Sequence, residues 1–328
     1  MQLVDVVGGS GFIGTSLVSK LIDNPNISVL IIDKKISAKY PKLTVICDIC
    51  NKDQLREAIR DNSVVIHLAA EHRDDVHPSD NYYRVNVEGT QNICDVALQK
   101  NVKRIIFTSS VAVYGANDSK KQVDEHCLPN PINHYGKSKL QAEKILEQWQ
   151  KKFQNEFYLT IVRPTVVFGI GNRGNLYNLL RKIYYRKFIM IGNGKNIKSI
   201  AYVENISFFI KTLLNQKDHL MIVNYVDKPD LTINELLFKS LIIMGRNPHI
   251  GLRIPISFGV SIGFIFDIFS YILKRKLSIS ASRVRKFTSN TQYSSKYLNI
   301  NNSNLISLDI ALRDTILSEF INKKSLEK

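Results

Sequence analysis

The sequence predicts an α/β protein with a doubly wound parallel sheet and a smaller C-terminal region. Short, β-branched apolar segments alternate with helical patterns through the first half of the chain. Such alternation is typical of a parallel sheet covered by helices on both faces. A glycine-rich turn also follows the first predicted strand, at the end of the sheet where ligands bind in such folds. The 328 residues, 44% hydrophobic and 23% charged, are enough for one large domain and a smaller one.

Six strands are expected in the first half: Leu3–Val7, Val29–Ile32, Leu43–Ile46, Val64–Leu68, Arg104–Thr108 and Leu159–Arg163. Helical patterns follow the first strand and recur near 52–60 and 84–100. Pro164 ends the sixth strand, and beyond about residue 165 the alternation loosens into segments rich in Gly, Asn and basic residues. We therefore predict one domain over residues 1–165 and a second region over residues 166–328.

The segment Gly8-Gly-Ser-Gly11-Phe-Ile-Gly14 follows the first strand and opens the first helix, with glycines spaced three residues apart at positions 8, 11 and 14. Glycines there permit a tight turn and let a pyrophosphate approach the N-terminus of the helix. This spacing predicts a Rossmann-type dinucleotide site. Asp33, at the end of the second strand, is placed to bond the adenosine ribose hydroxyls and to repel a 2′-phosphate. NAD is therefore favoured over NADP, although two lysines follow Asp33.

Two further segments support a dinucleotide. Asp48 lies beyond the third strand, where it is placed to receive the adenine amino group. His67-Leu-Ala-Ala70 ends the fourth strand with small residues, as a ligand passing close to the backbone requires. The alternative is a glycine turn that only packs.

Tyr135 and Lys139 lie four residues apart, on one face of a predicted helix. A free tyrosine has a pKa of about 10, and a fixed positive charge beside it lowers that pKa. Tyr135 is therefore a candidate acid/base at a carbon–oxygen centre. Ser109 and Ser110 end the fifth strand, where a hydroxyl can hydrogen-bond the reacting oxygen. The alternatives are a chance spacing of Tyr and Lys, and a serine that only caps a helix.

The formal net charge of +16 suggests an anionic partner or a generally basic proteome. Nucleic acid is disfavoured, because the basic residues are spread out without interleaved aromatic residues or a recognition motif. The N-terminus is predicted to be a strand and not a secretory signal, so the four cysteines are expected as reduced thiols in the cytoplasm. Cys47-Asp-Ile-Cys50 lacks the second pair that a zinc site needs, and no metal is predicted.

Residues 254–273 are strongly apolar, and Lys274-Arg-Lys276 follows at once. A spanning helix needs about 20 apolar residues, but Pro255 lies near the start of this segment and Asp267 lies inside it. An apolar helix in the membrane interface, with cations beside anionic lipid, fits better than a full span. A buried core helix is the alternative.

The chain resembles the extended short-chain dehydrogenase/reductase superfamily, in its NAD-dependent epimerase/dehydratase branch. The resemblance spans the whole chain and rests on Gly8-x-x-Gly11-x-x-Gly14, His67-Leu-Ala-Ala70, Asn86, Ser109-Ser110, Tyr135-x-x-x-Lys139 and Arg163-Pro164. It implies that Tyr135 is the proton acceptor, that Ser110 also contacts the substrate hydroxyl, and that Lys139 holds the nicotinamide ribose. It implies an NAD site formed by Gly8, Gly11, Phe12, Ile13, Gly14, Asp33, Asp48, Ile49, Leu68, Ala69, Ala70, Asn86, Ser109, Tyr135, Lys139 and Pro164.

One departure from the branch indicates the reaction. Dehydratases and decarboxylases of the branch carry an acidic residue just after the serine or threonine, where this chain has Val111 and Ala112. Neither side chain can protonate a leaving hydroxyl or manage a second proton transfer. The sequence therefore favours an epimerase, which removes and returns hydrogen at one carbon.

A second set of segments, at 71–76, 173–180, 198–203, 224–231 and 282–287, resembles bacterial 4-epimerases that act on an amino sugar carried by undecaprenyl diphosphate in O-antigen assembly. This implies interconversion of N-acetylglucosamine and N-acetylgalactosamine on a polyprenyl diphosphate. It implies a membrane surface as partner, at the cytoplasmic face of the bacterial inner membrane. The substrate is assigned to Glu71, Arg73, Ser110, Arg173, Asn175 and Lys198.

Three other functions stay open at this point. A UDP-sugar 4-epimerase would use the same catalytic residues. A hydroxysteroid-type dehydrogenase acting on a hydrophobic alcohol would also use Ser, Tyr and Lys, but it would produce stoichiometric NADH. A non-catalytic NAD-binding regulator ranks last, because this chain retains both Tyr135 and Lys139. A homodimer is possible.

Overall fold

Seven parallel strands form the main sheet, in the order β10-β6-β5-β4-β1-β2-β3. The computed structural model describes residues 1–73, 76–115, 122–249, 251–272, 280–298 and 304–322. The strands of the main sheet are β1 (Gln2–Val7), β2 (Ile27–Asp33), β3 (Thr44–Ile46), β4 (Val64–His67), β5 (Arg104–Thr108), β6 (Tyr158–Pro164) and β10 (Leu220–Tyr225). The strand order reverses between β1 and β4, and the crevice at such a point is where open α/β sheets bind ligands.

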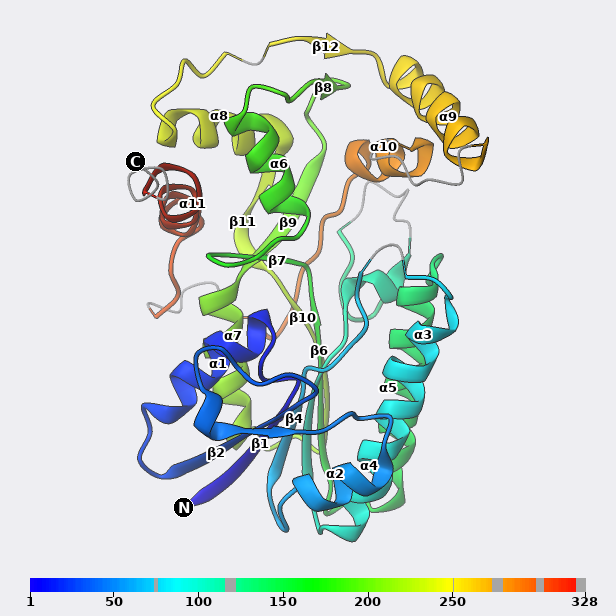
Figure 1. Ribbon diagram of the computed structural model, residues 1–328, viewed down its shortest axis with the longest axis vertical. Coiled ribbons are helices and arrows are strands. Elements are labelled where there is room, and N and C mark those ends of the chain that lie inside the picture. The colour runs from blue at the N-terminus through cyan, green and yellow to red at the C-terminus, as the bar shows by residue number, and fades with distance from the viewer. Residues whose placement is uncertain (74–75, 116–121, 250, 273–279, 299–303, 323–328) are drawn as a thin grey trace.

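Helices cover both faces of this sheet (Figure 1). On one face lie α1 (Phe12–Ile22) and α7 (Val203–Thr212), and their apolar residues share a core with β1, β2 and β4. On the other lie α2 (Lys52–Ala58), α4 (Gly89–Gln99) and α5 (His134–Lys152), in a core that includes Leu55, Ile93 and Leu146. Short elements join them: η1 (Pro41–Leu43), α3 (Asp80–Tyr83), η2 (Arg84–Glu88), η3 (Val111–Tyr114) and η4 (Leu213–Asn215).

The C-terminal half forms a second body of structure beyond the carboxyl ends of the main strands (Figure 1). Its strands are β7 (Val166–Phe168), β9 (Ile197–Tyr202) and β11 (Asp227–Thr232) in one sheet, and β8 (Met190–Ile191) paired with β12 (Arg253–Ile254). Its helices are α6 (Asn175–Tyr184), α8 (Ile233–Ile243), α9 (Ile256–Ile272), α10 (Ala281–Thr288), α11 (Leu308–Ile316) and η5 (Leu317–Ile321). Its own core includes Phe168, Leu180, Leu236 and Leu312.

The fold class predicted from the sequence is confirmed, and all six expected strands are present within about two residues of their expected ends. The expected boundary at residue 165 does not coincide with the end of the sheet. The chain returns after β9, because α7 packs beside α1 and β10 pairs with β6 as an edge strand. The segment 254–273 is a helix from Ile256 to Ile272. Within the described ranges, no helix has both the length and the apolar character that crossing a bilayer would take.

Replacing Leu17 by Ala tests the packing of α1 on the sheet. Leu17 is completely buried in the core shared with β1 and β4. The variant should lose about 2–5 kcal/mol of unfolding free energy, because the cavity cannot fully collapse. Ile22→Ala, at an exposed position of the same helix, should stay within about 0.5 kcal/mol. Chemical denaturation measures both, and equal losses in the two variants would contradict this packing.

Candidate active site

The glycine turn brings β1, β4 and α1 into contact. Gly8 has φ +83°, and a Cβ built there would lie 2.4 Å from the Ala69 backbone nitrogen. A Cβ on Gly14 would lie 2.6 Å from Gly9 Cα. Only glycine fits at either position, for a backbone reason at Gly8 and a packing reason at both. At Gly11, in contrast, a Cβ would meet only the Gly8 carbonyl at 3.2 Å.

The N-terminus of α1 is suited to an anionic group. Gly11 occupies the N-cap position without a side chain that could bond the first N–H groups, and Phe12 and Ile13 begin the helix. Asp33 lies beside this turn at the end of β2: its Oδ2 accepts a hydrogen bond from Ser10 N–H (3.1 Å), and its Oδ1 accepts one from Lys35 N–H (3.1 Å). A helix N-terminus and a neighbouring carboxylate are the groups that a dinucleotide's pyrophosphate and ribose require.

The predicted adenine side is formed by residues 47–50. Asp48 is exposed, and its Oδ1 accepts from Cys50 N–H (3.0 Å). Ile49 is buried against α4, where a Cβ on Gly89 would lie 2.6 Å from Ile49 Cδ1. Burial, followed by the charge of Asp48, raises the pKa of the Cys47 and Cys50 thiols to about 11. Both therefore stay protonated at neutral pH, which argues against reactive thiols.

Asn86 ties the end of β4 to α5. Its Oδ1 accepts from Glu71 N–H (2.8 Å), and its Nδ2 donates to the Glu71 carbonyl (3.0 Å) and to Ser138 Oγ (2.9 Å). The residue is fully buried. These bonds hold Leu68, Ala69 and Ala70, which are half-buried, at a fixed distance from α5.

The catalytic candidates meet where α5 packs on η3. Asn133 caps α5 through a hydrogen bond from Gly136 N–H (2.8 Å), which places Tyr135 in the first turn and Lys139 one turn later. A Cβ on Gly136 would lie 2.5 Å from the Ala112 carbonyl oxygen, so the helix touches the turn that follows Ser110. Tyr135 therefore begins a helix that packs against the turn after Ser110, and the catalytic roles of the two residues stay a prediction.

The two serines at the end of β5 have different surroundings. Ser110 Oγ accepts from Ala112 N–H (3.1 Å) and so caps η3. Ser109 is buried, and its Oγ has no hydrogen-bond partner within the described part of the chain. A buried hydroxyl without a partner costs free energy, and a bound ligand would supply the missing bond.

Lys139 is buried against an aromatic face. It is 1% exposed, and its Nζ lies 4.0 Å from the centroid of the Phe107 ring. Burial lowers the pKa of Lys139 to about 7, and the charge of Glu143 partly opposes this shift. His67 also lies in this buried layer, where burial and then the charge of Lys139 hold its pKa well below the usual value. His67 is therefore neutral at working pH, with Nε2 3.0 Å from Thr90 Oγ1.

A buried ion pair supports the same helix, and sequence reasoning missed part of it. Arg163 donates to both carboxylate oxygens of Glu143 (3.0 and 2.7 Å) and to Tyr114 Oη (2.8 Å). Glu143 follows Lys139 by four residues, so it continues the stripe of Tyr135 and Lys139. That spacing is the signal that could have found it. Pro164, next to Arg163, is buried at the end of β6.

The predicted substrate residues lie in three sets of contacts. Glu71 is nearly buried and forms a two-bond ion pair with Arg73 (2.9 and 2.6 Å), whose hydrogen bonds are the main reason that the pKa of Glu71 falls to about 2. Arg173 lies over the Tyr177 ring and pairs with the buried Glu319 (3.1 Å). Asn175 begins α6 and is exposed.

Lys198 forms the third set. Its Nζ donates to the carbonyls of Lys286 (2.9 Å) and Ser289 (2.7 Å), at the C-terminal end of α10. Burial lowers its pKa to about 8. These bonds give Lys198 a structural role as a tie between β9 and α10, and its predicted contact with a diphosphate stays a prediction.

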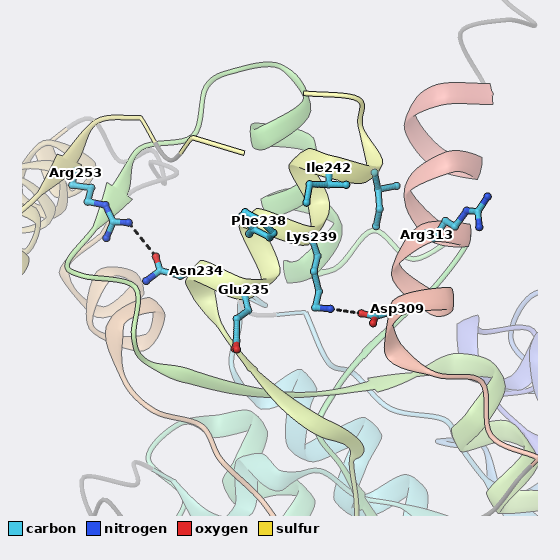
Figure 2. Close-up of a pocket in the computed structure, with 9 residues that line it drawn as sticks. Asn234, Glu235, Phe238, Lys239, Ile242, Arg253, Asp309 and Arg313 are labelled. Atoms are coloured by element: carbon cyan, nitrogen blue, oxygen red, sulfur yellow. Dashed lines mark hydrogen bonds and ion pairs between the residues drawn. The ribbon is translucent and has the colours of Figure 1, made fainter. Parts of the chain in front are cut away.

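A large hollow lies away from these residues. It measures about 710 Å³ and lies between α8, β12 and α11 (Figure 2). Phe238 and Ile242 line its apolar floor, and the ion pair of Lys239 with Asp309 (2.6 Å) crosses it. None of the catalytic candidates lines it, so it is no part of the active site.

The fold and site define a dinucleotide-binding α/β enzyme with Ser, Tyr and Lys at the carboxyl edge of the sheet. The chain belongs to the 3-beta hydroxysteroid dehydrogenase/isomerase family, whose model matches residues 5–224. This confirms the resemblance to the extended short-chain dehydrogenase/reductases.

The relatives of the chain include sugar epimerases and sterol dehydrogenases. The chain is 45% identical over 325 residues to the N-acetyl-alpha-D-glucosaminyl-diphospho-ditrans,octacis-undecaprenol 4-epimerase of Escherichia coli O157:H7, covering 97% of this chain and 96% of that one. It is 30% identical to the UDP-glucose 4-epimerase of Vibrio cholerae, over 76% and 78% of the two chains. The UDP-glucuronic acid 4-epimerase of Bacillus cereus, solved in complex with NAD, has the same fold (TM-score 0.71, 20% identity, 100% of both chains).

The pH dependence of stability tests the burial of Lys139. Its pKa is about 7 in the folded protein and about 10.4 in an unfolded chain. Between these values the unfolded chain binds more protons, so this group's destabilising effect is complete below about pH 7 and is relieved as the pH rises. From about pH 7 to about pH 9, the cofactor-free wild type should gain unfolding free energy relative to Lys139→Met, by at most about 1.4 kcal/mol per pH unit. Urea denaturation at each pH measures this, and parallel curves for the two proteins would refute it.

Proposed function

We propose that this protein is an NAD-dependent 4-epimerase that interconverts N-acetylglucosamine and N-acetylgalactosamine on undecaprenyl diphosphate, for surface polysaccharide assembly. The observation that carries the proposal is the 45% identity, over nearly both full chains, to the E. coli protein with that substrate in its name. The packing of α5 supports the proposal, because Gly136, next to Tyr135, touches the turn after Ser110, and Lys139 follows Tyr135 by one helical turn.

The residues present fit NAD. The cradle formed by Gly8, Gly11 and Gly14 has no room for larger side chains at two of its three positions, and Ser109 Oγ lacks a partner. Asp33 would hold the ribose and disfavour a 2′-phosphate. The remaining predicted contacts are Phe12, Ile13, Asp48, Ile49, Leu68, Ala69, Ala70, Asn86, Tyr135, Lys139 and Pro164. When bound, NAD supplies a reversible acceptor for the hydrogen on a sugar carbon.

In this proposal Tyr135 Oη takes the proton of the sugar 4-hydroxyl and later gives it back, so it acts as general base and then as general acid. Ser110 Oγ donates to the same oxygen and orients it. The Lys139 ammonium, held without solvent on the Phe107 ring, favours the negative charge that forms on the phenol. Because one Tyr135 serves both faces of the carbon, the grip on the diphosphate must let the sugar turn.

The turn after Ser110 argues against elimination. Val111 and Ala112 carry no acidic group, and Ala112 lies against Gly136 of α5. Neither of these two side chains can therefore donate a proton to a leaving hydroxyl. An acidic residue at either position would be needed for the dehydratase or decarboxylase chemistry of the branch.

The substrate contacts are part of the proposal. Glu71, Arg73 and Ser110 would meet the sugar, and Arg173, Asn175 and Lys198 would lie toward the diphosphate. In this division, residues 1–165 hold the cofactor and meet the sugar, residues 166–328 supply the contacts toward the diphosphate, and β10 completes the sheet of the first part. A lipid-linked sugar also implies a membrane surface as partner, at the cytoplasmic face of the inner membrane. A homodimer stays a prediction.

Tyr135→Phe should lower turnover about a hundred- to ten-thousand-fold, because the ring remains but the proton transfer is lost. Conversion of the lipid-linked sugar, followed by chromatography of the released sugar, measures this. Tyr158→Phe is the matched control, since Tyr158 begins β6 at the opposite end of the sheet and stacks on His219. Normal turnover in Tyr135→Phe would remove Tyr135 from the proposed chemistry.

The choice of substrate is tested by offering purified protein N-acetylglucosaminyl-diphospho-undecaprenol and UDP-N-acetylglucosamine side by side. We expect conversion of the lipid-linked sugar, without stoichiometric NADH. Conversion of the nucleotide sugar alone would make the protein a UDP-sugar 4-epimerase. Stoichiometric NADH with a hydrophobic alcohol would instead identify a dehydrogenase, the other activity that its family name covers.

A further inference from the structure

Helix α9 exposes its large apolar side chains. Phe258, Ile265, Ile268 and Phe269 are each between 52% and 62% exposed, and Phe264 is 51% exposed. A surface helix of a soluble protein buries this face against the core and presents polar residues to water. An exposed apolar surface of this kind marks an interaction site.

The inward face of α9 is formed by small and polar residues. Gly259, Gly263 and Asp267 follow one another at four-residue intervals and share one stripe. A Cβ on Gly263 would lie 2.6 Å from Ala281 N, and one on Gly259 would lie 2.7 Å from Ile191 Cγ2. The two glycines let α9 lie close to α10 and β8.

Asp267 has its partner on this inward side. Its Oδ2 accepts a hydrogen bond from Ala281 N–H (3.0 Å), at the N-terminus of α10. The carboxylate, which argues from sequence against a membrane span, therefore faces the protein. It leaves the outward face of α9 without an acidic group among the described side chains, which end at Phe269.

Cations border the apolar face. Arg283, Arg285 and Lys286 are exposed on α10, and the Arg285 guanidinium lies 5.5 Å from the centre of the Phe264 ring. Exposed apolar residues with cations beside them are the composition of a surface that lies in the headgroup region of an anionic bilayer. We use "the α9–α10 face" for the exposed residues of these two helices.

The neighbouring ribbon continues the apolar surface. β8 and β12 pair beside α9 (Figure 1), with Met190 N–H donating to the Leu252 carbonyl (3.1 Å). Ile189 and Leu252 are 49% and 66% exposed, and Arg253 is exposed next to them. The exposed apolar area is thus larger than one helix.

The α9–α10 face is joined firmly to the substrate part of the molecule. Lys198 of β9 donates to the Lys286 and Ser289 carbonyls, and Asn196 Nδ2 donates to the Phe287 carbonyl (2.8 Å). β9 pairs with β7, which directly follows the end of β6. A surface bound at α10 is therefore held in a fixed relation to the site.

We propose that the α9–α10 face docks on an anionic lipid bilayer, with α9 lying in the plane of the interface and the α10 cations on lipid phosphates. A second copy of the chain fits this face less well, because pairing two such faces would bring like charges together. The docking proposal depends only on the geometry of this face. The role of docking, which is to meet a polyprenyl diphosphate where its headgroup leaves the bilayer, rests on the proposed function.

Vesicle flotation tests this. The purified protein is mixed with phosphatidylcholine vesicles, with or without phosphatidylglycerol, at low and high salt. Wild type should float with the anionic vesicles and bind them about tenfold or more tightly than neutral ones, and salt should weaken this binding.

Phe258→Ser/Ile268→Ser should lose about tenfold or more of the binding to anionic vesicles. Arg283→Gln/Arg285→Gln should lose the preference for anionic lipid. Ile22→Ser/Ile310→Ser, at exposed apolar positions elsewhere, is the matched control and should bind as wild type.

Circular dichroism and thermal melting confirm that each variant is folded, and turnover of substrate in detergent micelles should be retained by both face variants. The docking proposal is overturned if the wild type floats with neither kind of vesicle, or if a folded Phe258→Ser/Ile268→Ser variant floats as the wild type does. It is also overturned if the wild type binds no vesicles and forms a dimer in light scattering that the same variant does not form. Flotation as expected without any epimerisation supports docking and overturns the proposed function alone.

Discussion

The proposed chemistry depends on a lysine that is buried one helical turn after a tyrosine. Lys139 is held in place by the Phe107 ring, and its ammonium has lost its water. Removing an ammonium from water is costly, and the lowered pKa of Lys139 expresses that cost. The fold keeps the arrangement because α5 is fixed at several points. Asn133 caps its start, Asn86 bonds Ser138, and Gly136 lets it touch the turn after Ser110.

The ion pair of Glu143 with Arg163 extends this arrangement into the core. Glu143 lies one turn after Lys139, where its charge favours the ammonium, and Arg163 satisfies both of its oxygens. Arg163 also bonds Tyr114 Oη, which in turn donates to Asn224 of β10 (2.9 Å). The catalytic helix is thereby connected to the last strand of the sheet. A buried pair of this kind is weak evidence for stability, but it specifies one arrangement of the groups around it.

The sequence predicts those parts of the fold and candidate site that depend on residues close together in the chain. The strands, the glycine turn, Asp33 and the spacing of Tyr135 and Lys139 each depend on a few neighbouring residues. That α7 and β10 are the segments that return to the sheet could not be predicted, because an edge strand of six residues gives no signal of which sheet it joins. The same holds for Glu319, which reaches Arg173 from 146 positions along the chain, and for Lys198, whose ammonium bonds α10. For Asp267, the position in the sequence is known but the face of α9 that carries it is not. The packing of α10 decides this, because Ala281 N–H donates to the Asp267 carboxylate on the inward side.

Retention of label at the reacting carbon tests the central claim most directly. N-Acetylglucosaminyl-diphospho-undecaprenol carrying deuterium at C4 is converted in ordinary water, and the product is examined by mass spectrometry. If Tyr135 exchanges only the hydroxyl proton and NAD would hold the hydrogen of C4 between its removal and return, the N-acetylgalactosamine product keeps its deuterium at C4. Loss of that deuterium to the solvent would contradict this account.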